Sequence, residues 1–435
     1  MKTVLKRLGI ESLNAMQEKV LSLDLQFQDL VLLAPTGSGK TLAYLLPLLS
    51  LLKEKGEMKV LILVPTRELA LQIEQVFNAM NTFRKVVCCY GGHAFDAERS
   101  AIKNKKPEVL IGTPGRLLDH LSKASFNPDT LEMLVIDEFD KALELGFQEE
   151  MEKIILQLRH IKRRVLISAT RMEEIPSFTG VENPMELDFL NSDANQRDRL
   201  DYHLVHSDKM DKIDALYHLL GSLEEGASIV FCNHRESVDR IGLLLSQRGV
   251  TCETYHGGQE QLVRERSLAK FKNGSSLVLI ATDLASRGLD IDKVKHIIHY
   301  HLPLSNELFV HRNGRTARWK EKGEVYVILN EKETLPDFMT EPFEVYSMED
   351  KTIKFQRPEW ITLYIGKGSR DRISKGDVAG FLYKQGKLNK EDLGMIDLQD
   401  HCTFVAIRRN KVKQLLVLVQ NEKLKGVKTL IEEAK

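Results

Sequence analysis

The sequence predicts an α/β protein with two tandem domains, each built on a doubly wound parallel sheet, followed by a small α+β domain. Short β-branched or leucine-rich runs alternate with longer helical patterns along most of the chain. These runs are continuously apolar, which is typical of strands buried on both faces of a parallel sheet. The length of 435 residues exceeds the usual size of one hydrophobic core, so two or three domains are expected.

In the first domain the expected strands cover residues 29–34, 59–65, 85–92, 108–114, 131–137 and 163–170. The same rhythm resumes after a polar stretch at 191–201, with expected strands at 227–233, 251–258, 276–283, 294–303 and 323–329. Residues 331–358 are acidic, carry three prolines and show no clear period, as expected of a connector. We therefore expect domains at 1–195 and 196–332, a linker at 333–355 and a third domain at 356–435.

The third domain has the order strand, helix, strand, strand, helix, strand. Its expected strands cover 360–368, 392–398, 401–409 and 424–431, and its helices 374–386 and 410–421. Two helices on a small sheet in this order match the split βαβ, ferredoxin-like pattern of an RNA-recognition (RRM-like) domain.

Bulk composition is that of a globular protein. Hydrophobic residues make up 43% and charged residues 29%, and no run of about 20 apolar residues is present, so we expect no membrane span. The first residues form an amphipathic helical pattern without features of a signal peptide, which predicts a cytoplasmic protein. The five cysteines have no CxxC spacing, which favours reduced thiols over a zinc site or a disulfide framework.

Charge is balanced overall but unevenly distributed. The chain has 62 basic and 62 acidic side chains, whereas residues 355–435 hold 16 basic and 10 acidic ones. The C-terminal domain is therefore the basic part of the protein, as expected of a segment that meets nucleic acid.

A phosphate-binding loop is the most specific motif. A predicted strand ends at Leu33, a helical pattern follows, and the eight residues between read Ala34, Pro35, Thr36, Gly37, Ser38, Gly39, Lys40 and Thr41. The glycines allow backbone amides to turn toward a polyphosphate, the lysine neutralises its oxygens, and the threonine hydroxyl can bind Mg²⁺. The alternative is a glycine-rich turn with a solvated lysine, which explains the full match and its setting less well.

A second site supports this prediction. The run "LVIDEFD" leads from a buried strand into Asp137 and Glu138. The first carboxylate would hold Mg²⁺ and the second would polarise an attacking water. Acidic residues at a strand end are often solvated turn residues, but the phosphate loop favours the catalytic interpretation.

Several further motifs in fixed order resemble those of DEAD-box RNA helicases, which are superfamily 2 enzymes with two RecA-like domains. The resemblance covers residues 9 to about 330 and rests on "PTREL", "GG", "TPGR", "SAT", "IVFCNHRESV", "ATDLASRGLDI" and "HRNGRTAR". It implies an RNA-stimulated ATPase that uses ATP and Mg²⁺ and melts RNA duplexes locally. Phe139 and Ala317 depart from the family pattern, which has alanine and glycine there.

The resemblance also implies roles for single residues. Gln17 would read adenine, although on sequence alone it could be a surface helix residue. Arg315 and Arg318 would act as arginine fingers, and Asp290 would contact the ribose. The residues implied to couple hydrolysis to RNA are Ser168, Thr170, Asp140, Asp283 and His311, although Ser168 to Thr170 could equally form a strand-end cap.

RNA would be held by its sugar-phosphate backbone, without a base code. The positions that the resemblance implies are Arg67, Gly91, Gly92, Thr113 and Arg116 in the first domain and His234, Arg235, Gln261, Arg264 and Thr282 in the second.

The C-terminal segments at 360–382 and 393–407 resemble the RNA-binding domain of DbpA-type helicases. This resemblance implies structured ribosomal RNA as partner, during assembly of the large subunit, and we expect a monomer. Tyr364 and Phe404 lie on the two central strands, where each could either stack on RNA or belong to the core. The cluster at Arg408, Arg409, Lys411 and Lys413 could bind RNA or be a solvated helix face.

Two other functions stay open at this stage. One is a nucleotide-gated RNA clamp that unwinds little, and the other is a DNA-directed translocase of the same superfamily. The carboxylates and arginines favour the enzyme, and the basic C-terminal domain favours RNA.

Overall fold

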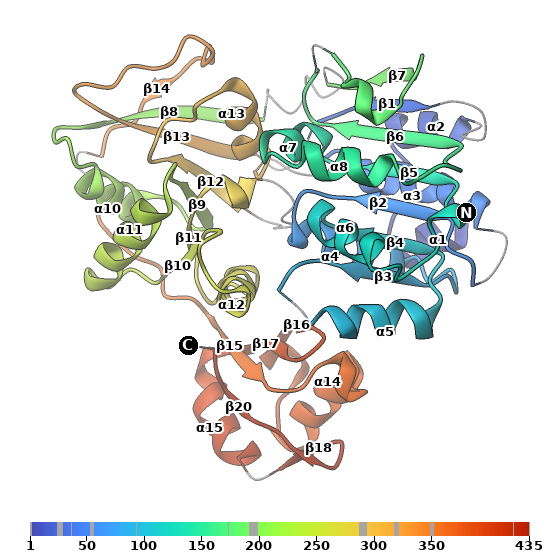
Figure 1. Ribbon diagram of the computed structural model, residues 1–435. Helices are drawn as coiled ribbons and strands as arrows, with labels where there is room; N and C mark the ends of the chain where they lie inside the picture. Colours follow the sequence, from blue (N-terminus) through green and yellow to red (C-terminus); the bar gives the residue numbers. More distant parts are fainter. Residues whose placement is uncertain are drawn as a thin grey trace. The chain divides into compact units, whose positions relative to one another are not determined.

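The computed structural model describes residues 2–23, 29–35, 37–52, 56–92, 94–172, 174–190, 199–286, 294–316, 322–348, 352–420 and 422–434. The chain divides into two compact units, one within residues 1–198 and the other from Arg199 onward (Figure 1). Each unit is described by itself.

The first unit contains a seven-stranded parallel sheet in the order β3-β4-β2-β5-β6-β1-β7. Its strands are β1 (Leu30–Leu33), β2 (Val60–Leu63), β3 (Val86–Cys89), β4 (Val109–Gly112), β5 (Met133–Ile136), β6 (Arg163–Ser168) and β7 (Met185–Asp188). The helices are α1 (Lys2–Arg7), α2 (Ala15–Ser22), α3 (Lys40–Leu51), α4 (Arg67–Ala79), α5 (Phe95–Lys105), α6 (Pro114–Ser122), α7 (Phe139–Glu144) and α8 (Gln148–Ile155). The six expected strands are confirmed, and β7 was not expected.

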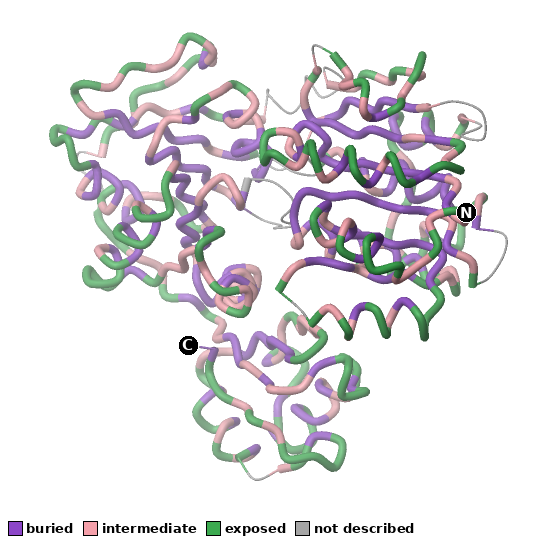
Figure 2. The backbone as a smooth tube through the Cα atoms, viewed as in Figure 1, coloured by how far each residue is buried: buried purple, intermediate pink, exposed green. Residues whose placement is uncertain are grey.

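Both faces of this sheet are covered, which explains the continuous apolar runs. Leu32 and Ile62 belong to one hydrophobic cluster, whereas their neighbours Leu33 and Leu61 belong to the other. The strands β1, β2, β4 and β5 are buried along their length, whereas the edge strand β7 is partly exposed and the outer helices expose one side (Figure 2). The predicted doubly wound architecture is thereby confirmed.

The second unit begins with another seven-stranded parallel sheet, in the order β10-β11-β9-β12-β13-β8-β14. Its strands are β8 (Leu200–Ser207), β9 (Ala227–Phe231), β10 (Cys252–Tyr255), β11 (Val278–Ala281), β12 (Val294–His299), β13 (Gly323–Asn330) and β14 (Glu344–Val345). The helices are α10 (Ile213–Ser222), α11 (Arg235–Gln247), α12 (Gln261–Lys272) and α13 (Asn306–Asn313).

Two segments of this unit differ from the prediction. The polar stretch expected to end at residue 201 already contains the start of β8, which pairs along its whole length with β13. The expected connector contributes β14, and its later part packs on α10, where the Lys354 amide donates to the Gly221 carbonyl over 2.8 Å. In both segments tertiary pairing overrides a polar sequence.

The C-terminal domain has a four-stranded antiparallel sheet in the order β16-β17-β15-β20. Its elements are β15 (Trp360–Ile365), α14 (Lys375–Lys384), β16 (Leu393–Leu398), β17 (Thr403–Arg408), α15 (Arg409–Val419) and β20 (Ile431–Glu433). The expected small α+β domain is confirmed. The last strand was predicted wrongly at 424–431, because Lys425 and Gly426 both have positive φ angles and turn the chain into the hairpin β18 (Lys423–Leu424) and β19 (Val427–Lys428).

One face of this sheet packs against α12 of the preceding domain. The Thr362 hydroxyl accepts a hydrogen bond from Asn273 Nδ2 over 3.1 Å and lies 2.6 Å from the Ser275 hydroxyl. Beside this polar contact Ala269 of α12 forms an apolar cluster with Cys402, Phe404 and Ala434. Phe404 is therefore a buried residue, and the half-buried Tyr364 packs against it with ring centroids 5.8 Å apart.

Candidate functional site

The loop between β1 and α3 has the geometry of a phosphate-binding loop. Gly37 and Gly39 have φ angles of 81° and 85°, in the left-handed region that glycine adopts without strain. Lys40 begins α3 and is buried, with Nζ donating to the carbonyl oxygens of Ala34 over 2.6 Å and Pro35 over 2.9 Å. Ser38 Oγ also donates to the Pro35 carbonyl, over 2.8 Å. The positive charge of Lys40 thus lies beside the loop at the N-terminus of α3, an arrangement that fits a polyphosphate. Thr36 of this loop lies outside the described residues.

Gln17 contacts this loop directly. Its side-chain Nε2 donates to the Gly39 carbonyl over 3.2 Å, and Asn14 Nδ2 donates to the Ser38 carbonyl over 2.9 Å. A side chain at Gly39 would displace Gln17, since a Cβ atom there would come within 2.5 Å of Gln17 Nε2. Gln17 is buried, so the alternative of a surface helix residue is wrong.

The predicted magnesium ligands are joined by a residue that the sequence did not reveal. Asp137 follows β5, and its Oδ2 accepts a hydrogen bond of 3.0 Å from the hydroxyl of Tyr44 on α3. The same hydroxyl also interacts with the Thr41 side chain. Burial raises the pKa of Asp137, and the positive charge of Lys40 opposes this rise. Two hard oxygen donors beside a phosphate loop suit Mg²⁺.

Glu138 has a strained backbone at the start of α7. Its φ angle is 49°, in the left-handed region that non-glycine residues seldom occupy, and its side chain is buried. The Glu138 amide donates to Asp137 Oδ1 over 2.9 Å, which orients both acidic residues together. Such strain is common where a side chain must be held for function.

Hydrogen bonds link Asp140 to the segment at the end of β6, and the coupling role of these residues stays a prediction. Thr170 Oγ1 donates to Asp140 Oδ2 over 3.0 Å, and Ser168 Oγ donates to the Thr170 carbonyl over 2.6 Å. Phe139 between the acidic residues turns away into the core, where its ring lies 6.4 Å from that of Phe178. The Asp140 to Thr170 contact therefore forms with the bulky residue in place.

The positions predicted to hold RNA in the first unit share one edge of the sheet. They follow the carboxyl ends of β2, β3 and β4, which are neighbouring parallel strands. The Arg67 guanidinium packs on the paired glycines, since a Cβ atom on Gly92 would lie 2.7 Å from Arg67 Nη1. Thr113 precedes α6 as its N-cap, and Arg116 lies in the first turn of that helix.

The corresponding positions in the second unit also share an edge, after β9, β10 and β11. His234 and Arg235 begin α11, Gln261 begins α12, and Thr282 follows β11. Arg264 is buried and donates to Gln261. Each unit therefore presents one predicted RNA edge.

A buried arginine that sequence reasoning missed organises the second unit. Arg312 on α13 donates to both carboxylate oxygens of Asp283, over 2.6 and 2.9 Å, and to Asn233 Oδ1 over 2.8 Å. His311, which directly precedes it, and Arg315, three positions after it, are also buried. Asp290 and Arg318 lie outside the described residues. The sequence motif contains all three arginines, at 312, 315 and 318, but it did not indicate that Arg312 pairs with Asp283.

Comparison with known proteins agrees with this geometry. Residues 14–177 match the DEAD/DEAH box helicase family, residues 211–320 the helicase conserved C-terminal domain, and residues 362–433 the DbpA RNA binding domain. ATP-dependent RNA helicase DbpA of Bacillus subtilis is 30% identical over 465 residues, which cover 99% of this chain and 96% of the relative. The chain belongs to the DbpA-type DEAD-box RNA helicases.

DbpA of Escherichia coli is likewise 30% identical, over 98% of this chain and 95% of its own. Among solved structures, Mss116p bound to single-stranded RNA and AMP-PNP matches 76% of this chain and 72% of its own, with a TM-score of 0.66 and 25% identity. Dbp5 of Saccharomyces cerevisiae bound to RNA and ADP BeF3 is similar in fold, with a TM-score of 0.70 over 80% of this chain and 94% of its own.

This DEAD-box helicase is an RNA-stimulated ATPase that uses ATP and Mg²⁺. The loop at Gly37 to Lys40 and the oxygens of Thr41 and Asp137 are a donor set that fits both groups. The roles of the individual residues stay predictions. No helix among the described residues is long and apolar enough to cross a membrane.

Proposed function

We propose that this helicase locally unwinds structured ribosomal RNA during assembly of the large ribosomal subunit, and that its C-terminal domain selects the site. The main support is the match of residues 362–433 to the DbpA RNA binding domain, in the basic part of the chain. A relative from Neurospora crassa, 36% identical over 75% of this chain and 64% of its own, is named an ATP-dependent rRNA helicase.

Within the first domain, Lys40 binds the phosphates, Thr41 and Asp137 hold Mg²⁺, and Glu138 polarises the attacking water. Mg²⁺ supplies neutralisation of the phosphate charge. The support is the joint orientation of Asp137 and Glu138 and the contact of Tyr44 with both oxygen donors. Gln17 reads adenine, and Asp290, Arg315 and Arg318 are the further nucleotide-binding residues that the family resemblance implies.

The two predicted RNA edges hold one strand by its backbone. Backbone amides, small residues and arginines at strand ends suit phosphates of any sequence. Hydrogen bonds between Ser168, Thr170 and Asp140 connect the acidic segment after β5 to the end of β6. In the second domain the ion pair between Asp283 and Arg312 holds the start of the segment after β11. His311 lies beside that pair. These contacts couple hydrolysis to the grip on RNA.

The RNA site is selected by a basic groove of the C-terminal domain. The sheet face that contains Phe404 does not serve for this, because α12 covers it. The groove has a volume of about 670 Å³ and is lined by Arg357, Arg408, Arg409 and Lys413 among others. Arg408 pairs with Glu359 and stacks on Trp360, whereas Arg357 and Lys413 are exposed. Exposed cations along a groove suit RNA phosphates.

The test measures ATP turnover of the full chain with large-subunit ribosomal RNA, small-subunit ribosomal RNA, unstructured RNA and matched DNA, together with displacement of a short duplex. We expect large-subunit RNA to half-saturate turnover at the lowest concentration and DNA to stimulate little. Equal half-saturation by all RNAs would remove the proposed substrate. Turnover without strand release would favour a nucleotide-gated clamp.

Charge reversal tests the groove. We expect Arg357→Glu with Lys413→Glu to remove the preference for large-subunit RNA while leaving stimulation by unstructured RNA unchanged. The matched control is Lys384→Glu with Lys387→Glu, which reverses two exposed charges elsewhere on the same domain. Loss of the preference in both pairs would show that overall charge, not the groove, selects the RNA.

A further inference from the structure

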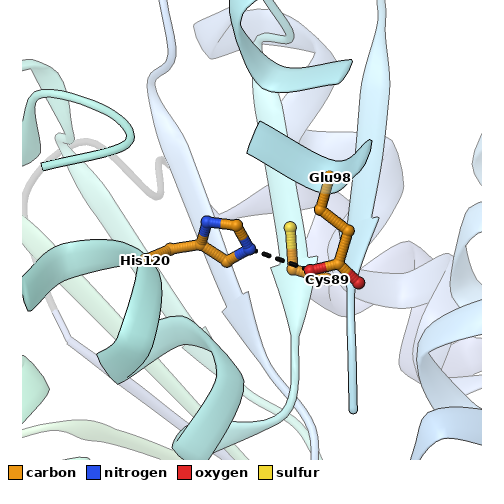
Figure 3. Close-up of side chains that lie close together, drawn as sticks. All are labelled: Cys89, Glu98 and His120. Atoms are coloured by element: carbon orange, nitrogen blue, oxygen red, sulfur yellow. Dashed lines mark hydrogen bonds and ion pairs between the residues drawn. The ribbon is translucent and has the colours of Figure 1, made fainter. Parts of the chain in front are cut away.

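A buried polar cluster lies under the RNA edge of the first unit and has no role in the nucleotide site. It contains Cys89 from the end of β3, Glu98 from α5 and His120 from α6, whose side chains converge from three elements (Figure 3). Their potential ligand atoms all lie within 4.8 Å of one another, and all three residues are buried. Such a set could hold a metal ion or could be a closed hydrogen-bond network.

The hydrogen bonds favour the network. Glu98 Oε1 accepts from the Tyr90 amide over 3.1 Å, and Oε2 contacts Arg116 Nε at 2.7 Å and His120 Nε2 at 2.8 Å. The other ring nitrogen of His120 lies 3.0 Å from the Ser125 hydroxyl. The Arg116 guanidinium already contacts the Glu98 oxygen that a metal ion would need, and its positive charge would repel the ion. Burial raises the pKa of the Cys89 thiol well above its usual value, so the thiol keeps its proton and is a poor metal ligand. A metal ion is therefore disfavoured at this cluster.

The Glu98 carboxylate is charged. Burial alone would raise its pKa, but hydrogen bonds from His120, Arg116 and the Tyr90 amide outweigh burial and lower the pKa below its usual value. A buried carboxylate that accepts three such bonds is held in one place. It can therefore fix the groups that donate to it.

Two of those donors belong to the predicted RNA edge. Arg116 is itself a predicted RNA contact, and the Tyr90 amide directly precedes Gly91 and Gly92. The Phe95 ring contacts two members of the network. It stacks on His120 with centroids 4.4 Å apart, and its centroid lies 5.2 Å from the Arg116 guanidinium carbon. One carboxylate thus connects two RNA motifs that are 25 positions apart, from Gly91 to Arg116.

We propose that Glu98 is a positioning residue for RNA binding, whose carboxylate holds Arg116 and the backbone before the paired glycines in the arrangement that meets RNA phosphates. This inference rests on the proposed RNA contacts of Arg116 and Gly91. Glu98 itself touches no RNA.

The test compares the RNA concentration that half-saturates ATP turnover in Glu98→Ala, Glu98→Gln and the unchanged chain. Glu98→Ala should raise this concentration about tenfold, as expected for loss of one charge-assisted contact. Maximal turnover and the KM for ATP should stay within about twofold, because the nucleotide site is separate. Glu98→Gln keeps one acceptor oxygen and should give an intermediate value.

Glu108→Ala is the matched control. Glu108 is as buried as Glu98 and accepts from the amides of Lys85 and Gly56, over 2.7 and 3.0 Å, but it precedes β4 at the opposite edge of the sheet. Its loss should lower thermal stability and leave the RNA half-saturation unchanged. If Glu108→Ala weakens RNA binding as much as Glu98→Ala does, general loosening of the domain explains both and the proposal is overturned.

Arg116→Ala separates this inference from the function on which it rests. We expect the Arg116→Ala chain to bind RNA more weakly, and adding Glu98→Ala to it should cost less than Glu98→Ala costs alone. Weaker binding by Arg116→Ala with no effect of Glu98→Ala would overturn the positioning role alone. No effect of Arg116→Ala would overturn the proposed RNA contact and the positioning role together.

Discussion

The hydroxyl of Tyr44 donates a hydrogen bond of 3.0 Å to Oδ2 of Asp137, which ties α3 to the end of β5. The two residues are 93 positions apart, and Tyr44 is fully buried. Burial and the neighbouring Asp137 carboxylate raise the pKa of Tyr44 well above its usual value, so the phenol keeps its proton and acts as a donor. The proposed magnesium ligand is therefore oriented by a group outside every recognised motif.

Tyr44→Phe should raise the Mg²⁺ concentration that half-saturates RNA-stimulated ATP turnover severalfold. The substitution removes the donor and leaves the ring, so Asp137 keeps its bond from the Glu138 amide but loses the donor that fixes Oδ2. A lost bond to a buried carboxylate should also lower the free energy of unfolding by about 1 to 3 kcal/mol. The measurement is a Mg²⁺ titration of ATP turnover at saturating RNA.

Tyr326→Phe provides the comparison for Tyr44→Phe. Tyr326 is buried in the second unit and donates to Glu324 over 2.6 Å, so the variant loses a similar bond away from the nucleotide loop. Its Mg²⁺ requirement should be that of the unchanged chain. Equal Mg²⁺ requirements in both variants would refute the orienting role of Tyr44.

The fold was readable from the sequence wherever strands are buried on both faces. β1 and β2 are fully buried, and their continuous apolar runs identified them. β8 was not predicted, because it pairs with the two-residue β14 on one side and is partly exposed. Its sequence therefore mixes histidine and aspartate with apolar residues. The hairpin at Lys425 and Gly426 was predicted as a single strand, because two short strands and a turn resemble one strand of the same length in sequence.

Thr170→Val should separate ATP hydrolysis from strand separation. Valine keeps the shape of threonine but removes the hydroxyl that donates to Asp140 over 3.0 Å. ATP turnover should stay close to that of the unchanged chain, whereas duplex displacement should fall about tenfold, the effect of one hydrogen bond to a charged group. Parallel assays of phosphate release and displacement of a labelled strand measure the two rates.

Thr179→Val is the matched control for Thr170→Val. Thr179 is buried in the same unit, and its hydroxyl donates to the Pro176 carbonyl over 2.8 Å, away from the acidic motif. Its displacement rate per ATP should be unchanged. A proportional loss of turnover and displacement in Thr170→Val would mean that the hydroxyl serves hydrolysis itself.

Ala269→Glu should release the C-terminal domain from α12. The substitution places a charge in the apolar cluster with Cys402 and Phe404, which costs free energy for as long as the contact stays closed. Cys402 is 4% exposed, so its alkylation by N-ethylmaleimide should become at least about tenfold faster when the contact opens, as expected for a locally unfolding site. Peptide mass spectrometry measures the rate at each cysteine.

Two references accompany Ala269→Glu. Cys232 at the end of β9 is fully buried and should react slowly in every variant. Ser246→Glu adds the same charge at an exposed position of α11 and should leave Cys402 protected. Unchanged protection of Cys402 in a folded Ala269→Glu chain would contradict the docking of the sheet face.

The phosphate loop, the pair Asp137 and Glu138, and the segment from Ser168 to Thr170 could be recognised from the sequence, because they lie at the ends of the buried strands β1, β5 and β6. The residues that orient them could not. Tyr44 resembles any core residue of an apolar helix, Arg312 resembles a third finger arginine, and Glu98 resembles a solvated residue of a charged helix. Their functions depend on contacts across 93, 29 and 18 positions, which a single sequence does not reveal.

The second unit should lose stability as the pH falls from about 6.5 toward 4, before most carboxylates titrate. Burial lowers the pKa of His296 to about 4, that of His299 to about 3 and that of His301 to about 4. The positive charges of Arg312 near His299 and of Lys212 near His301 lower these pKa values further. Glu324 raises the pKa of His296 but does not outweigh its burial. A group whose pKa is lower in the folded chain than in the unfolded chain stabilises the fold above the unfolded value of 6.5 and loses that stabilisation as the pH falls. At pH 5 the loss in the free energy of unfolding is about 2 kcal/mol each for the fully buried His296 and His299.

Both tryptophans, at 319 and 360, lie in this half of the chain, so tryptophan fluorescence is used to follow its thermal unfolding. His296→Gln should make the midpoint less dependent on pH, whereas His160→Gln, at an exposed position of the first unit, should not. A midpoint that stays constant between pH 7 and 5 would show that these histidines take up protons as readily in the folded protein as in the unfolded chain.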